Sequence, residues 1–281
     1  MKYLSFVKFS HSIFSLPFAL IGFLEALKVR PDADLIWLSG FTLLALVSAR
    51  TAAMGFNRIV DRHIDAKNER TAKRELPSGR MSIAAAWLVV MISIVVFIFS
   101  AYKLNMLAFY LSPVALFVIL SYSYTKRFTS LSHFILGMGL GIAPVAAFIA
   151  VTGNFSIPLI FLGVGVMLWT AGFDIIYALQ DLDFDKKENL HSIPVKLGEK
   201  NSKILALLTH IVSTGLIIYF WFGYSGKVIP GIGTLLFSIL VFYQHIIVHR
   251  HGLSKINLAF FTLNGMAGLL LGLAYLIEFL I

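Results

Sequence analysis

The 281-residue sequence contains no cysteine. Disulfide bonds, thiolate catalysis and cysteine-ligated zinc or iron–sulfur sites are therefore excluded. Charged residues are also scarce, at 13% of the chain, which is about half of the ~25% share that is usual in soluble domains. Hydrophobic residues reach 58% and the mean hydropathy is +0.86. This composition indicates an all-α membrane protein rather than one or two soluble domains.

Nine apolar runs approach the roughly 20 residues that a membrane-spanning helix needs. They cover about residues 12–27, 35–56, 83–101, 104–124, 131–151, 157–179, 204–224, 228–248 and 256–280. The runs are continuously apolar rather than alternating, which excludes a strand barrel. We therefore expect a bundle of nine transmembrane helices, capped by helical loops at the cytoplasmic end, in a single polytopic domain over residues 1–281.

The net charge of +9 is unevenly distributed along the chain. If the nine spans alternate in direction, 18 of the 23 Lys and Arg residues lie on the side of the N-terminus, and 4 lie on the other side. Cytoplasmic loops of membrane proteins carry such an excess. The sequence thus predicts an inner (plasma) membrane protein with a cytoplasmic N-terminus. The same rule explains the positive charge without nucleic acid, so the lipid bilayer is the expected partner and nucleic acid is not.

The second apolar run ends in the charged stretch "NRIVDRHIDAKNER", residues 57–70. Asn57, Asp61 and Asp65 follow one another at intervals of four. Side chains four apart are neighbours on a helix face. If the helix continues past the apolar run, these three groups form a ladder along its cytoplasmic end.

The sixth run ends in a second acidic stretch, "DIIYALQDLDFD". On a continuous helix, Asp174, Tyr177, Asp181 and Asp185 share one face. Each acidic stretch is followed by basic residues, a proline and a nearby glycine. The two motifs, at residues 57–65 and 174–185, therefore suggest an internal repeat of a helix group.

Carboxylate and amide oxygens in register suit a hard divalent cation. Mg²⁺ binds through few protein carboxylates and completes its shell with water and substrate phosphates. The nearby cations that are suited to the remaining phosphate charge are Lys67, Arg70, Lys73, Arg74, Lys186 and Lys187. A solvated loop accounts for the lysines but not for the aligned acids. The pattern therefore predicts a magnesium–diphosphate site at the cytoplasmic mouth of the bundle.

The motifs Asn57-Arg58-x2-Asp61-x3-Asp65 and Asp174-x2-Tyr177-x3-Asp181-x3-Asp185 resemble the two signature motifs of the UbiA superfamily of intramembrane prenyltransferases. The resemblance covers essentially the whole chain. The stretches "KFSHSIFSLPFAL", "RTAKRELPSG", "SYSYTKRFT" and "HSIPVKLG" are similar to the branch that prenylates 4-hydroxybenzoate or related aromatic acids in quinone biosynthesis. "YALQDLDFDKKE" is similar to members assigned to menaquinone formation by the futalosine route.

The resemblance implies an enzyme that transfers a polyprenyl group from polyprenyl diphosphate to an aromatic acid with Mg²⁺. Catalytic roles fall on Asp61, Asp65, Asp181 and Asp185. The implied magnesium ligands are Asn57, Asp61, Asp65, Asp174, Asp181 and Asp185. The implied diphosphate contacts are Arg58, Arg70, Lys73, Arg74, Lys126 and Lys186.

Arg50 is the only basic residue deep within an apolar run. It precedes Asn57 by seven residues and so lies on the same helix face. Arginine binds carboxylates well, so one hypothesis is that it holds the carboxylate of an aromatic acid. The alternative is a structural pair with a carboxylate such as Asp174. Tyr177 is the aromatic residue we expect beside a carbocation, because a ring face stabilises positive charge.

Two acceptors fit this interpretation, 4-hydroxybenzoate and 1,4-dihydroxy-6-naphthoate, which belongs to menaquinone biosynthesis. A cation-coupled membrane transporter is the alternative from another functional class. Transporters place key charges near the membrane midplane on broken helices, whereas the acidic residues here gather at one face. The sequence therefore favours the enzyme.

Overall fold

The computed structural model describes Phe6 and residues 13–281, and all regular secondary structure in this part of the chain is helical. The long helices are α2 (Leu16–Val29), α3 (Leu35–Lys67), α4 (Ile83–Leu104), α5 (Met106–Thr125), α6 (Ser132–Thr152), α7 (Ile157–Ala178), α9 (Ile193–Phe220), α10 (Val228–His251) and α11 (Asn264–Leu280). Eight of the described helices are long and apolar enough to cross a membrane. Helix α2, with 14 residues, is shorter and is the ninth helix of the bundle. The predicted nine-helix bundle of a multi-pass membrane protein is confirmed.

Short elements continue or connect these helices. They are η2 (Leu179–Asp181) and α8 (Leu182–Lys187) after α7, η3 (Trp221–Ser225) after α9, η4 (Gly252–Lys255) after α10, and η5 (Leu258–Leu263) before α11. The elements η3 and η5 are π-helical turns.

Two helices extend beyond their apolar runs. Helix α3 continues to Lys67 because Ile59 on its last turns packs into a buried apolar cluster with Phe6 and Met81. Helix α9 begins at Ile193 rather than at residue 204, with the Ser192 hydroxyl accepting from the Val195 backbone N–H, and Gly198 (φ 75°) kinks it between this first turn and the long apolar part. These polar helical turns lie outside the hydrophobic pattern, which predicts only the span itself.

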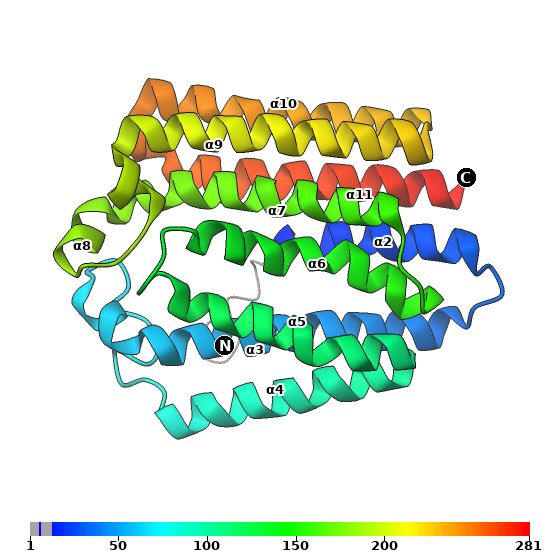
Figure 1. Ribbon diagram of the computed structural model, residues 1–281, viewed down its shortest axis with the longest axis horizontal. Coiled ribbons are helices and arrows are strands. Elements are labelled where there is room, and N and C mark those ends of the chain that lie inside the picture. Colours follow the sequence, from blue (N-terminus) through cyan, green and yellow to red (C-terminus); the bar gives the residue numbers. More distant parts are fainter. Residues whose placement is uncertain (1–5, 7–12) are drawn as a thin grey trace.

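The helices lie side by side and the chain crosses the bundle back and forth (Figure 1). Successive connections therefore gather at two ends. The connections 68–82, 126–131, 179–192 and 252–257 lie at one end, which we call the site end, and the alternate connections lie at the far end. This alternation matches the distribution of basic residues in the described part of the chain. Lys2 and Lys8, which add to the predicted cytoplasmic charge, lie outside the described residues.

Glycines allow the central helices to approach closely. A Cβ atom on Gly22 of α2 would meet the Pro144 carbonyl oxygen of α6 at 2.0 Å, and one on Gly137 of α6 would meet the Met167 carbonyl oxygen of α7 at 2.2 Å. Small residues at such contacts are the usual basis of helix packing in lipid, where apolar burial drives little association. The contact of α6 with α2 and α7 thus holds the centre of the bundle together.

We expect Gly22→Ala to lower the stability of the purified protein by about 1–3 kcal/mol, because backbone atoms would have to move to make room for the added methyl group. Gly40→Ala is the matched control, since a Cβ there meets nothing within 4 Å and alanine favours the helix by about 0.5–1 kcal/mol. Thermal unfolding in detergent measures both variants. Equal melting temperatures for the two would contradict the packing account.

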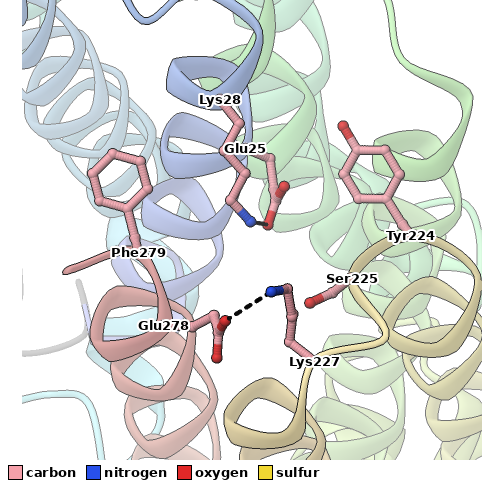
Figure 2. Close-up of a pocket in the computed structure, with 7 residues that line it drawn as sticks. All are labelled: Glu25, Lys28, Tyr224, Ser225, Lys227, Glu278 and Phe279. Carbon is pink, nitrogen blue, oxygen red and sulfur yellow. Dashed lines mark hydrogen bonds and ion pairs between the residues drawn. The ribbon is translucent and has the colours of Figure 1, made fainter. Parts of the chain in front are cut away.

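The far end carries a polar pocket of about 510 Å³ between α2, α11 and the segment that runs from η3 to the start of α10 (Figure 2). Its charges cancel in pairs: Lys28 Nζ lies 2.8 Å from Glu25 Oε1, and Lys227 Nζ lies 3.7 Å from Glu278 Oε1. A pocket with no excess of positive charge has little to attract a diphosphate. The site end is therefore the better candidate for an anionic substrate.

Candidate active site

The last turns of α3 present three polar side chains on one face. The Asn57 Nδ2 group donates a hydrogen bond to Asp61 Oδ2 over 3.0 Å, which is the contact between side chains four apart on a continuous helix. Asp61 and Asp65 are only 2% and 5% exposed. Buried carboxylates are costly unless positive groups compensate them.

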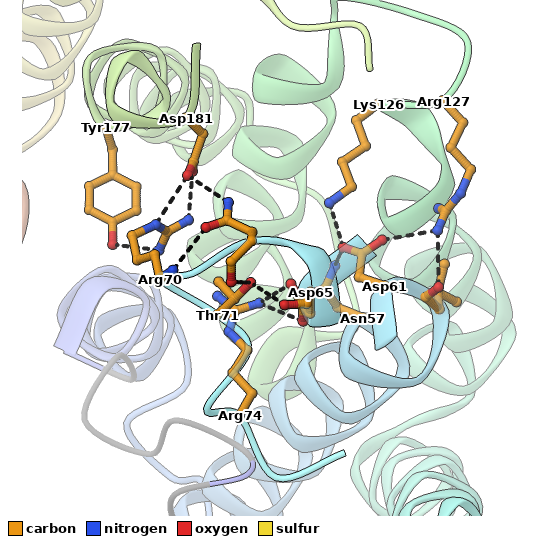
Figure 3. A network of polar contacts seen from close by, with 12 residues as sticks. Asn57, Asp61, Asp65, Arg70, Thr71, Arg74, Lys126, Arg127, Tyr177 and Asp181 are labelled. Atoms are coloured by element: carbon orange, nitrogen blue, oxygen red, sulfur yellow. Dashed lines mark hydrogen bonds and ion pairs between the residues drawn. The ribbon is translucent and has the colours of Figure 1, made fainter. Parts of the chain in front are cut away.

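Basic side chains compensate both buried aspartates (Figure 3). Lys126 Nζ lies 2.7 Å from Asp61 Oδ2, and Arg127 Nη2 lies 3.1 Å from Asp61 Oδ1. Arg74 Nη1 donates to both carboxylate oxygens of Asp65 at 2.8 Å. The first motif therefore carries its own set of cations, drawn from the loop after α3 and the end of α5.

Arg70, which follows Asp65 by five residues, contacts the second motif (Figure 3). Its Nε and Nη2 groups donate to Asp181 Oδ1 and Oδ2 at 3.2 and 2.6 Å, the bidentate geometry of a strong charged pair. Its Nη1 group donates to the Tyr177 hydroxyl over 3.3 Å. Asn68 Nδ2 also donates to Asp181 Oδ1 over 3.0 Å. The Thr71 hydroxyl oxygen lies 3.0 Å from the Asp65 carbonyl oxygen and 3.4 Å from that of Asn68, so the network connects two motifs that are more than 100 positions apart in the sequence.

The charge of Arg70 is secured by this arrangement. Burial lowers the pKa of Arg70, but the hydrogen bonds to Asp181 and its negative charge raise the pKa by more. The pKa of Arg70 therefore lies above its ordinary value. A second link runs parallel to the first, because Lys67 Nζ lies 2.5 Å from Glu188 Oε2. The loop after α3 is therefore tied to the segment after α7 at two points.

The prediction that the second motif lies on one continuous helix is wrong. Helix α7 ends at Ala178, and the chain passes through η2 before α8 begins at Leu182. A 3₁₀ turn holds three residues rather than 3.6, which changes the spacing along the second motif, although Arg70 still contacts both Tyr177 and Asp181. Asp174 instead pairs with His133, whose Nδ1 lies 2.7 Å from Asp174 Oδ2. Asp185 interacts with Ser192.

The predicted magnesium ligands have suitable chemistry, since all six supply carboxylate or amide oxygens, which hard cations prefer. Within residues 13–281, however, no three acidic or histidine side chains converge as they would around a metal ion. The carboxylates of Asp61, Asp65 and Asp181 are held by basic side chains instead. By its chemistry alone, the donor set thus fits magnesium.

The predicted diphosphate contacts divide into three groups. Arg70, Arg74 and Lys126 face the aspartates directly. Arg58 is buried nearby, and its Nε and Nη1 atoms have no hydrogen-bond partner among the described residues. Lys73 and Lys186 are exposed, and the structure does not bring their ammonium groups into this network.

Sequence reasoning gave no site role to Asn68, Arg127, His133 or Glu188. Arg127 was detectable as the neighbour of Lys126 in a short basic pair. Asn68 and Glu188 resemble ordinary loop residues in the sequence, and their contacts with Asp181 and Lys67 arise only from the folded chain. His133 begins α6 in a stretch that carries no other polar signal for a site.

A cavity of about 490 Å³ lies within the bundle between α3, α5 and α6. Its wall is mostly apolar, and its polar side chains are Ser15, Thr42, Arg50, Ser112 and Tyr122. Arg50 stands two turns before Asn57 on α3, roughly 10 Å along the helix axis. The cavity therefore approaches the acidic ladder along one face of α3.

The structure places the two predicted acceptor contacts differently. Arg50 lines the cavity, and its Nε atom is buried without a hydrogen-bond partner among the described side chains. Asp174 pairs with His133 and not with Arg50 among the described residues. Tyr177 lies outside the cavity wall, where its ring stacks on Phe260 at a centroid distance of 4.0 Å and Arg70 lies over its face.

The sequence matches the UbiA prenyltransferase family over residues 15–266. The 4-hydroxybenzoate octaprenyltransferase of Haemophilus ducreyi is 32% identical over 204 residues, which are 72% of this chain and 73% of the relative. The enzyme of that name from Francisella tularensis subsp. tularensis is 29% identical over 249 residues, covering 88% and 85% of the two chains.

Solved structures share the fold. The apo structure of a UbiA homolog from Aeropyrum pernix K1 matches with a TM-score of 0.86 and 31% identity, over 95% of this chain and 98% of that one. A UbiA homolog from Archaeoglobus fulgidus, bound to GPP and Mg²⁺, matches over the whole of both chains with a TM-score of 0.79 and 19% identity.

Proposed function

The chain belongs to the UbiA prenyltransferase family, and on this premise we propose that it transfers a polyprenyl group from polyprenyl diphosphate to a small aromatic acid in respiratory quinone biosynthesis. The names of the relatives support an aromatic acid as the acceptor. The predominance of basic residues at the site end supports its location on the cytoplasmic side.

One observation carries the proposal most directly. Arg70, from the loop after the first motif, holds Asp181 of the second motif in a bidentate pair. Acidic side chains from two distant segments, with at least four cations, therefore belong to one site beside an apolar cavity. This combination suits a substrate with a charged diphosphate head and a hydrocarbon tail.

The proposed reaction breaks the allylic C–O bond, and its electron pair leaves with pyrophosphate. A ring carbon of the acceptor attacks the allylic cation, a C–C bond forms, and the ring proton is released. Arg70, Arg74 and Lys126 stabilise the charge that develops on pyrophosphate, with Arg58, Lys73 and Lys186 as the further proposed contacts. The apolar wall of the cavity excludes water, which would otherwise capture the cation.

Magnesium, when bound, supplies positive charge at the diphosphate oxygens. We assign its ligands to the oxygen-bearing side chains Asn57, Asp61, Asp65, Asp174, Asp181 and Asp185. The Archaeoglobus fulgidus homolog, solved with GPP and Mg²⁺, has the same fold. Asp61, Asp65, Asp181 and Asp185 carry the catalytic role, since they hold the charged head group in place.

Arg50 is the proposed anchor for the carboxylate of the acceptor. Arg50 lines a cavity with few other polar groups, and its Nε atom is buried without a hydrogen-bond partner among the described residues. An arginine fork binds a carboxylate through two parallel hydrogen bonds. Tyr177, supported by Phe260, stands beside the diphosphate end of the path, where its ring can face the developing cation.

Arg50→Ala should lower turnover of the aromatic acid by about tenfold to a hundredfold, because a charged hydrogen bond contributes about 1.5–3 kcal/mol. Turnover of the matching phenol without a carboxylate should change little. Arg50→Lys keeps the charge but loses the forked hydrogen-bonding geometry. Its turnover of the aromatic acid should therefore lie between those of the unmodified protein and Arg50→Ala. Equal losses with both acceptors would assign Arg50 a structural role instead.

The proposed function is tested by mass spectrometry of the products. Purified protein receives Mg²⁺, a mixed-length pool of polyprenyl diphosphates, 4-hydroxybenzoate and 1,4-dihydroxy-6-naphthoate. We expect one prenylated aromatic product and one pyrophosphate for each product molecule. Prenylation of the naphthoate alone would move the assignment to menaquinone biosynthesis. The absence of any prenylated product would contradict the proposal and leave the transporter interpretation.

A further inference from the structure

His133 lies between the two ends of the second acidic motif. It is 4% exposed, at the start of α6, and both of its ring nitrogens are engaged. Nδ1 lies 2.7 Å from Asp174 Oδ2, and Nε2 lies 3.4 Å from the backbone nitrogen of Ile193. One imidazole thus contacts α7 before the helix break and the first residue of α9 after it.

These contacts indicate which ring nitrogen of His133 carries the proton. The Ile193 backbone N–H can only donate, so Nε2 is the acceptor and carries no proton. The proton of the neutral ring is then on Nδ1, which donates to the Asp174 carboxylate. This tautomer satisfies both neighbours at once, whereas a doubly protonated ring would lose the contact with Ile193.

The segment that His133 holds is the one that follows Asp185. The Leu190 N–H donates to the Asp185 carbonyl oxygen over 2.8 Å, and the His191 N–H donates to the Lys126 carbonyl oxygen over 2.7 Å. His133 and Lys126 lie at the two ends of the α5–α6 connection. This connection therefore fixes residues 190–193 at two points, and the side chain of Lys126 also contacts Asp61 of the first motif.

The helix break makes such a support necessary. On a continuous helix, backbone hydrogen bonds alone would set the spacing of Asp174, Asp181 and Asp185. The 3₁₀ turn of η2 and the six-residue helix α8 are short elements with little stability of their own. Their position therefore depends on contacts with other parts of the chain.

We propose that His133 is a positioning residue that holds Asp174 and the segment after Asp185 in one fixed arrangement, and so sets the geometry of the second acidic motif toward Mg²⁺–diphosphate. This inference rests on the proposed function for its magnesium readout. Side chains that orient metal-binding carboxylates typically change metal affinity or activity by tenfold to a hundredfold when they are removed.

Two conservative variants separate the two contacts. Asparagine reproduces the Nδ1–H donor of histidine, so His133→Asn keeps the contact with Asp174 and loses the one with Ile193. Glutamine reaches the position of Nε2, so His133→Gln keeps an acceptor for the Ile193 N–H and loses the donor to Asp174. His133→Ala removes both.

His210 provides the matched control. It is also a fully buried histidine between helices, with Nδ1 2.7 Å from His245 Nε2 and Nε2 3.0 Å from the Trp169 carbonyl oxygen. Neither of these two contacts involves a residue of the acidic motifs. His210→Ala therefore measures the general cost of removing a buried imidazole from this bundle.

The test combines amide hydrogen exchange in residues 190–193 with the Mg²⁺ concentration that gives half-maximal prenyl transfer. His133→Ala should speed exchange at least about tenfold and raise the Mg²⁺ requirement about tenfold to a hundredfold. His133→Asn should speed exchange at Ile193 with a smaller effect on Mg²⁺, and His133→Gln should do the reverse.

Two results would overturn the proposal. One is a His133→Ala protein with the exchange pattern and Mg²⁺ requirement of the unmodified protein. The other is a His210→Ala protein that changes both readouts equally, which would show general loosening of the bundle. If the unmodified protein transfers no prenyl group, the proposed function fails, while hydrogen exchange still decides whether His133 holds residues 190–193.

Discussion

Replacing Asp181 with asparagine should reduce prenyl transfer at least about a hundredfold, the usual cost of removing one group that stabilises transition-state charge. Asparagine keeps the shape of the side chain but removes its negative charge, and it presents an amide to Arg70. Arg70 then loses its bidentate partner at 2.6 and 3.2 Å. The link between the two acidic motifs is weakened together with the proposed metal ligand.

The loss should appear in activity rather than in folding. The Arg70 side chain is 37% exposed, and ion pairs that are open to solvent contribute little to stability. Asp183→Asn is the matched control, since Asp183 is exposed in the adjoining helix α8 and forms no ion pair among the described residues. Initial rates and thermal unfolding of both variants check this prediction. Full activity of Asp181→Asn would refute the role of the second motif.

Removing magnesium with a chelator should abolish prenyl transfer, and adding Mg²⁺ back should restore it. Ca²⁺ should restore much less, because it is larger and prefers six to eight oxygen ligands. The metal is required because the diphosphate of the substrate is strongly negative. Arg70, Arg74 and Lys126 cannot neutralise all of this charge while they also hold aspartates.

The same ion pairs predict how the metal binds. Asp61, Asp65 and Asp181 already have basic partners, so Mg²⁺ alone should change the melting temperature little. Mg²⁺ together with pyrophosphate should raise it, because a ligand that binds only the folded state stabilises that state. Full activity in excess chelator would contradict the metal assignment.

Hydrophobic patterning predicted the bundle well because the membrane imposes the length and composition of each span. It missed the polar turns beyond the spans, such as the turn of α9 that begins at Ile193, since the Ser192 cap and the kink at Gly198 rather than apolar burial set its bounds. The ladder of Asn57, Asp61 and Asp65 followed from the helix repeat alone.

The second motif shows where local rules stop. Periodicity assumed a straight helix through Asp185, and no local signal in the sequence revealed the 3₁₀ turn at Leu179–Asp181. The pairs of Arg70 with Asp181 and of Lys67 with Glu188 join residues more than 100 positions apart. Such contacts depend on tertiary packing, which a single sequence does not encode in a visible pattern.

The role of His133 was hidden for a similar reason. A lone histidine at the start of an apolar helix resembles any interhelical hydrogen-bond partner. Its two contacts, with Asp174 and with the Ile193 backbone, come from segments far away in the sequence. Only the fold shows that both belong to the surroundings of the second motif.

Calorimetric titration of inorganic pyrophosphate tests most directly whether the two motifs form one magnesium–diphosphate site. The unmodified protein should bind pyrophosphate only in the presence of Mg²⁺. Asp61→Asn and Asp181→Asn should each weaken binding at least about tenfold, and the double variant should lose less than the sum of the two effects, as expected for groups that share a ligand. Binding without Mg²⁺, or unchanged affinity in either single variant, would contradict the account.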